Sequence, residues 1–91
     1  MKAKVIVINP KDNVAVALED LHAGDRVTLP DGSGLTVAGD VPAGHKVALR
    51  EISAGCEVVK YGENIGNAVE TIRRGEWVHT HNLDIRGGEA R

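Results

Sequence analysis

Residues 41–47 read VPAGHKV, and the same plan recurs as LHAGDRV at 21–27, ISAGCEV at 52–58 and IRRGEWV at 72–78. In each segment an apolar residue is followed three positions later by glycine and six positions later by valine. Glycine tolerates the left-handed backbone that tight turns require, and valine favours strands. Each segment therefore predicts a turn that is anchored by its first apolar side chain and leads directly into a β-strand.

The spacing of the four segments suggests that they are arranged in pairs. Their glycines, Gly24, Gly44, Gly55 and Gly75, are separated by 20, 11 and 20 residues. This palindromic spacing predicts two similar halves, each with a pair of turn-and-strand units, folded around one core. The alternative is coincidence, because Ala-Gly before a charged residue is common in turns.

The remaining segments favour strands, with one exception. Alternating or β-branched runs at 4–8 and 14–18 read as strands, and PDGSG at 30–34 predicts a hairpin turn. A helix is expected over 65–74, because Ile65, Val69 and Ile72 have helical spacing and Gly75 can end the helix. We therefore predict a mainly β fold with one short helix.

Two aromatic residues and the chain ends complete the structural expectations. Tyr61 precedes the expected helix and Trp77 follows it, so we expect the two rings to pack together and hold the helix against the strands. Residues 85–91 offer little to bury and are predicted to form a flexible tail.

Length and composition predict one domain spanning residues 1–91. A chain of 91 residues rarely divides its core, and with two aromatic residues and no Phe that core must consist of Val, Ile, Leu and Ala. A domain this small buries roughly 60–65% of its chain surface. We therefore expect a partner subunit or a homo-oligomer to add buried surface.

Charge and patterning argue against several classes of protein. The net charge of -2 and the scattered Lys and Arg residues do not form the basic stripe of a nucleic-acid binder. No apolar run approaches the roughly 20 residues of a membrane span, and the N-terminus shows no secretory cleavage site. With the single Cys56, these features favour a cytoplasmic protein.

Two polar segments carry the candidate site residues. His79 and His81 are two apart, so an extended strand would present both imidazoles to one metal or anion. His45 and Lys46 follow a turn glycine and together suit a carboxylate. The alternatives are a solvated strand end and an ordinary charged turn. No phosphate loop or nucleophile–base pattern is present in the sequence, so no catalytic residue is assigned.

Three motifs occur in a specific order: PAGHK at 42–46, YGENIG at 61–66 and VHTHN at 78–82. Their combination resembles the N-terminal domain of altronate and galactarate dehydratases, from about Val5 to Leu83. The resemblance implies an antifreeze-like (SAF) domain with a β-clip fold. It also implies a small accessory subunit that is inactive alone and works with a large catalytic dehydratase subunit, because the chain ends just after the last motif.

The resemblance also implies a chemistry. In such lyases a proton is removed next to the carboxylate of a sugar acid and a β-hydroxyl leaves as water, with Fe²⁺ or another divalent metal. His45 and Lys46 are then expected at the substrate, and His79 and His81 at the metal or the subunit interface. The small subunit of sulfolactate sulfo-lyase, which expels sulfite, is an open alternative. A non-catalytic sugar-acid-binding module and a structural assembly domain also remain open.

Overall fold

The computed structural model describes residues 4–84. Within this range the chain forms nine short strands and no helix. The strands are β1 (Val5–Ile6), β2 (Val14–Ala17), β3 (Arg26–Thr28), β4 (Gly34–Thr36), β5 (Lys46–Ala48), β6 (Glu57–Lys60), β7 (Glu63–Ala68), β8 (Trp77–Val78) and β9 (Leu83–Asp84).

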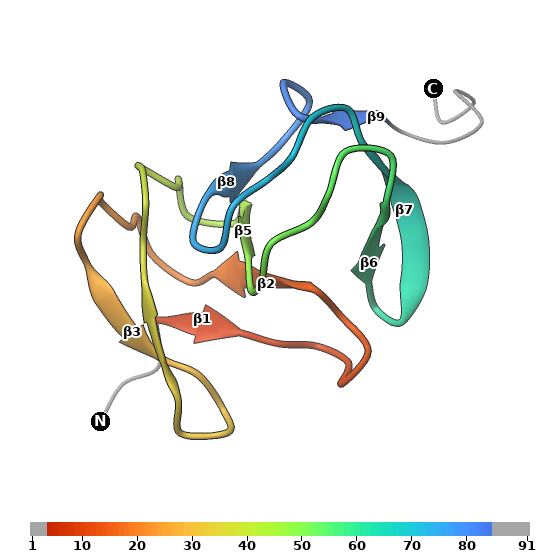
Figure 1. Ribbon diagram of the computed structural model, residues 1–91. Coiled ribbons are helices and arrows are strands. Elements are labelled where there is room, and N and C mark those ends of the chain that lie inside the picture. The colour runs from red at the N-terminus through yellow and green to blue at the C-terminus, as the bar shows by residue number, and fades with distance from the viewer. Residues whose placement is uncertain (1–3, 85–91) are drawn as a thin grey trace.

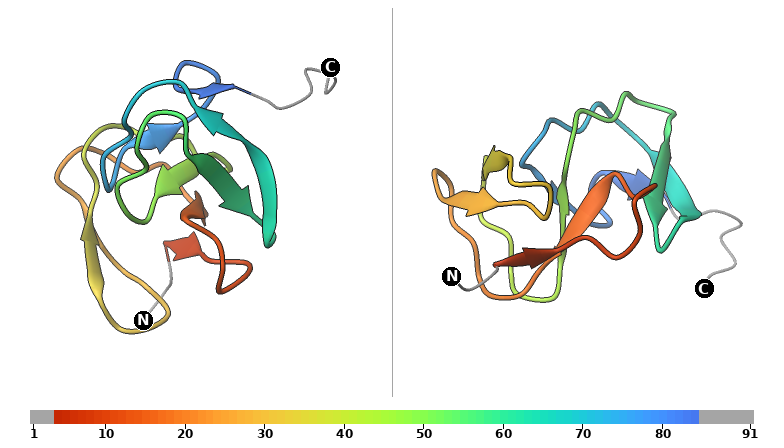
Figure 2. Two further views of the ribbon diagram at one scale, coloured as in Figure 1. Left: turned by 45° about the vertical axis from the view of Figure 1, so that its right-hand side comes forward. Right: turned by 90° about the horizontal axis from the view of Figure 1, so that it is seen from below.

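The strands form three antiparallel sheets. The central sheet has the order β1-β2-β5-β8, β3 and β4 form a hairpin, and the third sheet has the order β6-β7-β9. The two smaller sheets lie on opposite sides of the central sheet (Figures 1 and 2). The prediction of a mainly β fold is confirmed.

The four repeated segments are turns, as predicted. Each glycine has a positive φ, between 85° and 91°. In each turn the N–H after the glycine donates to the carbonyl three residues earlier, and a strand follows at once. The strands that the four units begin are β3, β5, β6 and β8.

The units pair as the palindromic spacing predicts. Leu21 of the first unit bridges Val41 of the second, and Ile52 of the third bridges Ile72 of the fourth. Within each pair the hydrogen bonds are reciprocal. The glycine N–H of one unit donates to a carbonyl of the chain just before the other unit, four residues ahead of that unit's bridging residue. These bonds are Gly24 to Val37, Gly44 to Ala17, Gly55 to Ala68 and Gly75 to Ala48.

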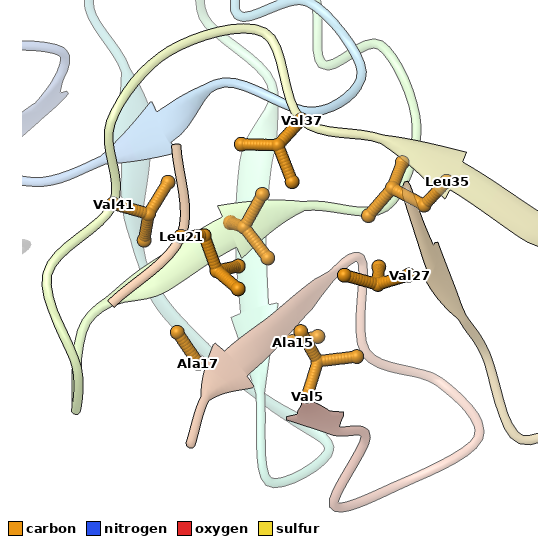
Figure 3. Close-up of a cluster of buried hydrophobic side chains, with 9 residues drawn as sticks. Val5, Ala15, Ala17, Leu21, Val27, Leu35, Val37 and Val41 are labelled. Carbon is orange, nitrogen blue, oxygen red and sulfur yellow. The ribbon is translucent and has the colours of Figure 1, made fainter. Parts of the chain in front are cut away.

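The halves enclose two cores, not the single core expected. Neighbouring residues of β5 show why: Val47 and Ala48 point to opposite faces of the central sheet, and both are fully buried. The first core, on the β3–β4 side, consists of Val5, Ala15, Ala17, Leu21, Val27, Leu35, Val37, Val41 and Val47 (Figure 3). The second, facing the β6-β7-β9 sheet, consists of Val14, Ala48, Ile52, Val58, Ala68, Ile72, Val78 and Leu83.

The predicted helix at 65–74 is wrong. Its first residues belong to β7, which returns antiparallel to β6. Tyr61 and Gly62 form the two-residue loop between these strands, with φ of 58° and 76°, a pattern typical of type I′ hairpins. The apolar residues that mimicked a helical face have separate surroundings, because Val69 is 55% exposed whereas Ile72 is buried.

The predicted contact between Tyr61 and Trp77 is also wrong. Without a helix nothing brings the two rings together, and Tyr61 is 58% exposed. The predicted tail at 85–91 lies outside the described residues. No helix long and apolar enough to cross a bilayer occurs in residues 4–84.

Candidate functional site

The pairing of β5 with β8 brings the predicted site residues together. Lys46 lies opposite Val78, and Val47 lies opposite Trp77. His45, just before β5, therefore comes next to His79, just after β8, and their ring centroids are 4.8 Å apart. Since β5 belongs to the second unit and β8 to the fourth, the site lies where the two halves of the molecule join.

Trp77 is the common neighbour of three histidines. The ring of His79 stacks on it with a centroid distance of 5.4 Å and an interplanar angle of 7°. His81 and His45 lie at 5.0 Å and 5.6 Å in tilted orientations. We call His45, Trp77, His79 and His81 the histidine–tryptophan cluster.

One hydrogen bond fixes the chemistry of His45. The indole Nε1–H of Trp77 donates to Nδ1 of His45 over 3.2 Å. An indole N–H can only donate, so Nδ1 is the acceptor and the neutral imidazole carries its proton on Nε2. His45 thus offers an N–H donor to an oxygen ligand and has no free lone pair for a metal.

The HTHN segment is a turn rather than the extended strand expected. The Asn82 N–H donates to the His79 carbonyl over 3.0 Å and closes the turn. The buried Asn82 side chain accepts from the His79 N–H and donates to the Trp77 carbonyl, at 3.0 and 2.9 Å. Such side-chain bonds compete with strand pairing. His79 and His81 therefore approach Trp77 through turn geometry, not strand alternation.

The surroundings of His79 favour its neutral form. Burial is the main cause that lowers its pKa below the ordinary histidine value, and the neighbouring side chains of His45, Lys46 and His81 lower it further. The pKa of Lys46 is also lowered, chiefly by burial and then by the charge of Lys60. Lys46 and Lys60 thus bring positive charge to this side of the cluster.

The structure separates the two predicted substrate residues. Side chains alternate along β5, so His45 shares the face of Val47, whereas Lys46 shares the face of Ala48. His45 lies with Trp77 and the first core, and Lys46 lies at the edge of the second core. Lys46 nevertheless stays close enough for its charge to lower the pKa of His79.

The other side of the cluster is acidic. A cleft of about 340 Å³ lies beside Trp77 and His81 and is also lined by Asp40, Glu70 and Glu76. Carboxylates repel an anionic ligand. An acid that reaches the cluster is therefore favoured on the His45 and His79 side.

The predicted metal site is not complete within this chain. Residues 4–84 contain no group of three or more His, Cys, Asp or Glu side chains that could hold an ion. A transition metal generally takes at least three protein ligands, and the hydrogen bond from Trp77 occupies His45. His79 and His81 alone do not fit a resident ion.

Sequence reasoning missed the roles of Trp77 and Asn82. A signal for Trp77 exists in the repeat, because the position two after the glycine is charged in the other three units, as Arg26, Lys46 and Glu57. Asn82 ends a polar tetrapeptide, where asparagine often hydrogen-bonds the local backbone.

Known proteins are similar to this sequence. Residues 3–86 match the altronate/galactarate dehydratase SAF domain. The chain is 48% identical over 77 residues to altronate dehydratase and 47% identical over 75 residues to galactarate dehydratase (L-threo-forming), both of Escherichia coli K12. These alignments cover 85% and 80% of the chain but only 15% and 14% of the enzymes.

A shorter relative matches over more of its own length. The chain is 52% identical over 52 residues to (2R)-sulfolactate sulfo-lyase subunit alpha of Paracoccus pantotrophus, which covers 57% of the chain and 78% of that subunit. The family match extends over nearly the whole sequence and confirms the resemblance drawn from the three motifs. The chain therefore belongs to the altronate/galactarate dehydratase SAF domain family, and this membership implies a β-clip fold.

Proposed function

We propose that this chain is the small accessory subunit of a metal-dependent sugar-acid dehydratase of the altronate or galactarate type. The observation that carries the proposal is the histidine–tryptophan cluster, which groups three imidazoles without completing a metal site within residues 4–84. A large catalytic subunit would complete it. A relative named as a subunit alpha supports such a partnership.

The geometry supports binding and orienting roles for two of the imidazoles. In the proposed reaction the C–H bond next to the carboxylate and the C–O bond to the β-hydroxyl break, a C=C bond forms, and water leaves. His45 would donate its Nε2–H to a substrate oxygen, since Trp77 holds its other nitrogen. His79, whose pKa is lowered by burial and by its neighbours, would offer a lone pair.

We extend the proposal to Fe²⁺ or another divalent ion in the assembled enzyme. His79 and His81 would supply two ligands and the large subunit the others, because two imidazoles alone give little chelation. We expect the metal content of the purified complex to fall in His79→Ala and in His81→Ala, and to remain unchanged in the control His22→Ala. Unchanged metal content in both cluster variants would contradict the assignment of His79 and His81 as metal ligands.

Reconstitution tests the proposed function. The chain should co-purify with a large dehydratase subunit, and the complex should release water from altronate or galactarate while the chain alone does not. If the chain forms no complex and no activity on either acid appears, the proposal fails.

A second candidate is the small subunit of a sulfolactate sulfo-lyase. It is favoured by the alignment that covers 78% of such a subunit, compared with 15% of altronate dehydratase. The same complex assayed with sulfolactate would release sulfite in place of water, so product analysis separates the two.

A further inference from the structure

Two lysines from different sheets face the same core. Lys46 lies on β5 two residues before Ala48, and Lys60 lies on β6 two residues after Val58. Ala48 and Val58 both belong to the second core, and side chains two apart share a face. The half-buried side chains of Lys46 and Lys60 therefore converge at the edge of that core.

Neither lysine has an anionic partner among the described residues. The one ion pair formed within residues 4–84 joins His22 and Asp40, on another turn. Glu63 lies opposite Lys60 in the β6–β7 register, yet no ion pair joins them. Partial burial, and then the charge of Lys60, lower the pKa of Lys46. Two like charges held together and partly out of water are unfavourable without an anion between them.

Tyr61 holds Lys60 in place. The ammonium nitrogen of Lys60 lies 4.9 Å from the centre of the Tyr61 ring, a cation–π geometry. Tyr61 has a φ of 58°, which is uncommon for a residue with a bulky side chain. A left-handed backbone is strained for an aromatic residue, and such strained residues often occur at functional sites.

We propose that Lys46 and Lys60 together bind one carboxylate group of the sugar-acid substrate. Lys60 is then a further substrate-binding residue and Tyr61 its positioning residue. The assignment rests on the proposed function, since it deepens the same site. Two ammonium groups suit one carboxylate because each can donate to a different oxygen.

Steady-state kinetics of the assembled complex test the pair. In Lys60→Gln, which removes the charge at similar length, we expect KM for the sugar acid to rise about tenfold, with kcat within about twofold. Lys60→Arg, which keeps the charge, should stay near wild type. Arg26→Gln on the β3–β4 sheet is the control for loss of a surface cation and should leave KM unchanged.

The carboxylate could instead come from an Asp or Glu of the large subunit. The dissociation constant of the complex distinguishes the two sources. An unchanged dissociation constant with raised KM supports the substrate. A weakened complex with unchanged KM overturns the substrate assignment. A Lys60→Gln variant with wild-type values of both KM and the dissociation constant overturns it as well.

Tyr61→Asn separates positioning from structure. Asparagine tolerates positive φ, so this variant should raise the Tm, yet without the ring we expect it to raise KM as well. A Tyr61 that is only structural would change the Tm and leave KM alone, which would contradict its positioning role.

A titration of the chain itself keeps the inference distinct from the proposed function. In ¹H–¹⁵N NMR with galactarate as the probe, saturable shifts should appear at Lys46 and Lys60 and disappear in Lys60→Gln. If the complex is inactive on altronate, galactarate and sulfolactate, the proposed function fails while this titration still reports on the pair. The absence of shifts at both lysines in the wild type would overturn the proposal that they bind a carboxylate together.

Discussion

A single indole N–H decides what His45 can do. With Nδ1 occupied by Trp77, the proton of the neutral ring lies on Nε2, so His45 acts toward a ligand as a donor. His79, stacked on the same indole, has a lowered pKa that favours the neutral form, which can accept. Trp77 thus fixes the donor role of His45 beside a second histidine that keeps a lone pair.

Trp77→Phe tests the tautomer of His45. The phenyl ring keeps the aromatic contact but lacks the N–H, so the neutral His45 should become a mixture of tautomers, and stability should fall by about 1 kcal/mol. Long-range ¹H–¹⁵N NMR of the imidazoles reads the tautomer directly. His22, outside the cluster, serves as the internal control, and a wild-type His45 protonated on Nδ1 would contradict the assignment.

The lowered pKa of His79 predicts a pH dependence of stability. In the unfolded chain the imidazole has a pKa of about 6.5, whereas the folded chain lowers it, so the unfolded state binds a proton more readily as the pH falls. The contribution is present above the unfolded pKa and is lost as the pH falls toward the lowered folded value. His79→Gln should therefore lose less Tm between pH 7.5 and 5.5 than wild type.

The control for this measurement is His22→Gln, which also removes one histidine but lies on another turn beside Asp40. We expect it to keep most of the wild-type acid sensitivity. Equal pH dependence of wild type and His79→Gln would show that His79 is not desolvated as described.

At the level of elements, the four glycine turns share a backbone conformation but not their surroundings. A Cβ on Gly24, with φ of 91°, would meet no atom within 4 Å. A Cβ on Gly75, with φ of 88°, would overlap the Thr36 carbonyl oxygen and approach the Ala38 nitrogen to 3.2 Å. The fourth turn therefore also packs against the end of β4, and the Gly75 carbonyl strengthens this contact by accepting from the Ala38 N–H.

Alanine at these two glycines separates conformation from contact. Gly24→Ala should cost about 1–2 kcal/mol of unfolding free energy, the price of a left-handed alanine. Gly75→Ala adds the overlap with Thr36 and should cost at least about 3 kcal/mol. Urea denaturation of both variants measures the difference, and equal losses would contradict the close approach of β4.

The turns were predictable from sequence because their glycine geometry is local. The pairing of units also followed from the spacing of the glycines. The helix over 65–74 was not excluded, because Ile65, Val69 and Ile72 match a helical period by chance. The hairpin that replaces it turns at Tyr61-Gly62, where Tyr stands in a position that usually takes Asn or Asp.

The site was only half predictable for a similar reason. The motifs indicated His45, His79 and His81, but their meeting depends on the register of β5 against β8, which lie far apart in sequence. The role of Asn82 in bending the HTHN segment is also tertiary, since its amide reaches back to Trp77. Lys60 could not be recognised as a site residue from the sequence, because its neighbour Lys46 comes from another sheet.

At the scale of the whole molecule, one sheet separates two cores. Val47 contributes to the first and Ala48 to the second, and both stand on β5. Each half covers its own core with a pair of turns, yet both cores pack against the central sheet. Neither core can lose its packing without exposing a face of the strands that support the other.

The shared sheet predicts that the two cores unfold together. Ile72→Ala in the second core should remove about 2–5 kcal/mol, as should Leu35→Ala in the first, because both side chains are fully buried. Trp77, the single tryptophan, packs against the first core and reports on it by fluorescence. In Ile72→Ala we expect the fluorescence midpoint to shift in urea by as much as the far-ultraviolet circular dichroism midpoint, as in a two-state transition. A fluorescence midpoint that stays at the wild-type value while the circular dichroism midpoint shifts would show that the two halves unfold independently. The pairing of β5 with β8 would then be a contact between separate units rather than part of one cooperative structure.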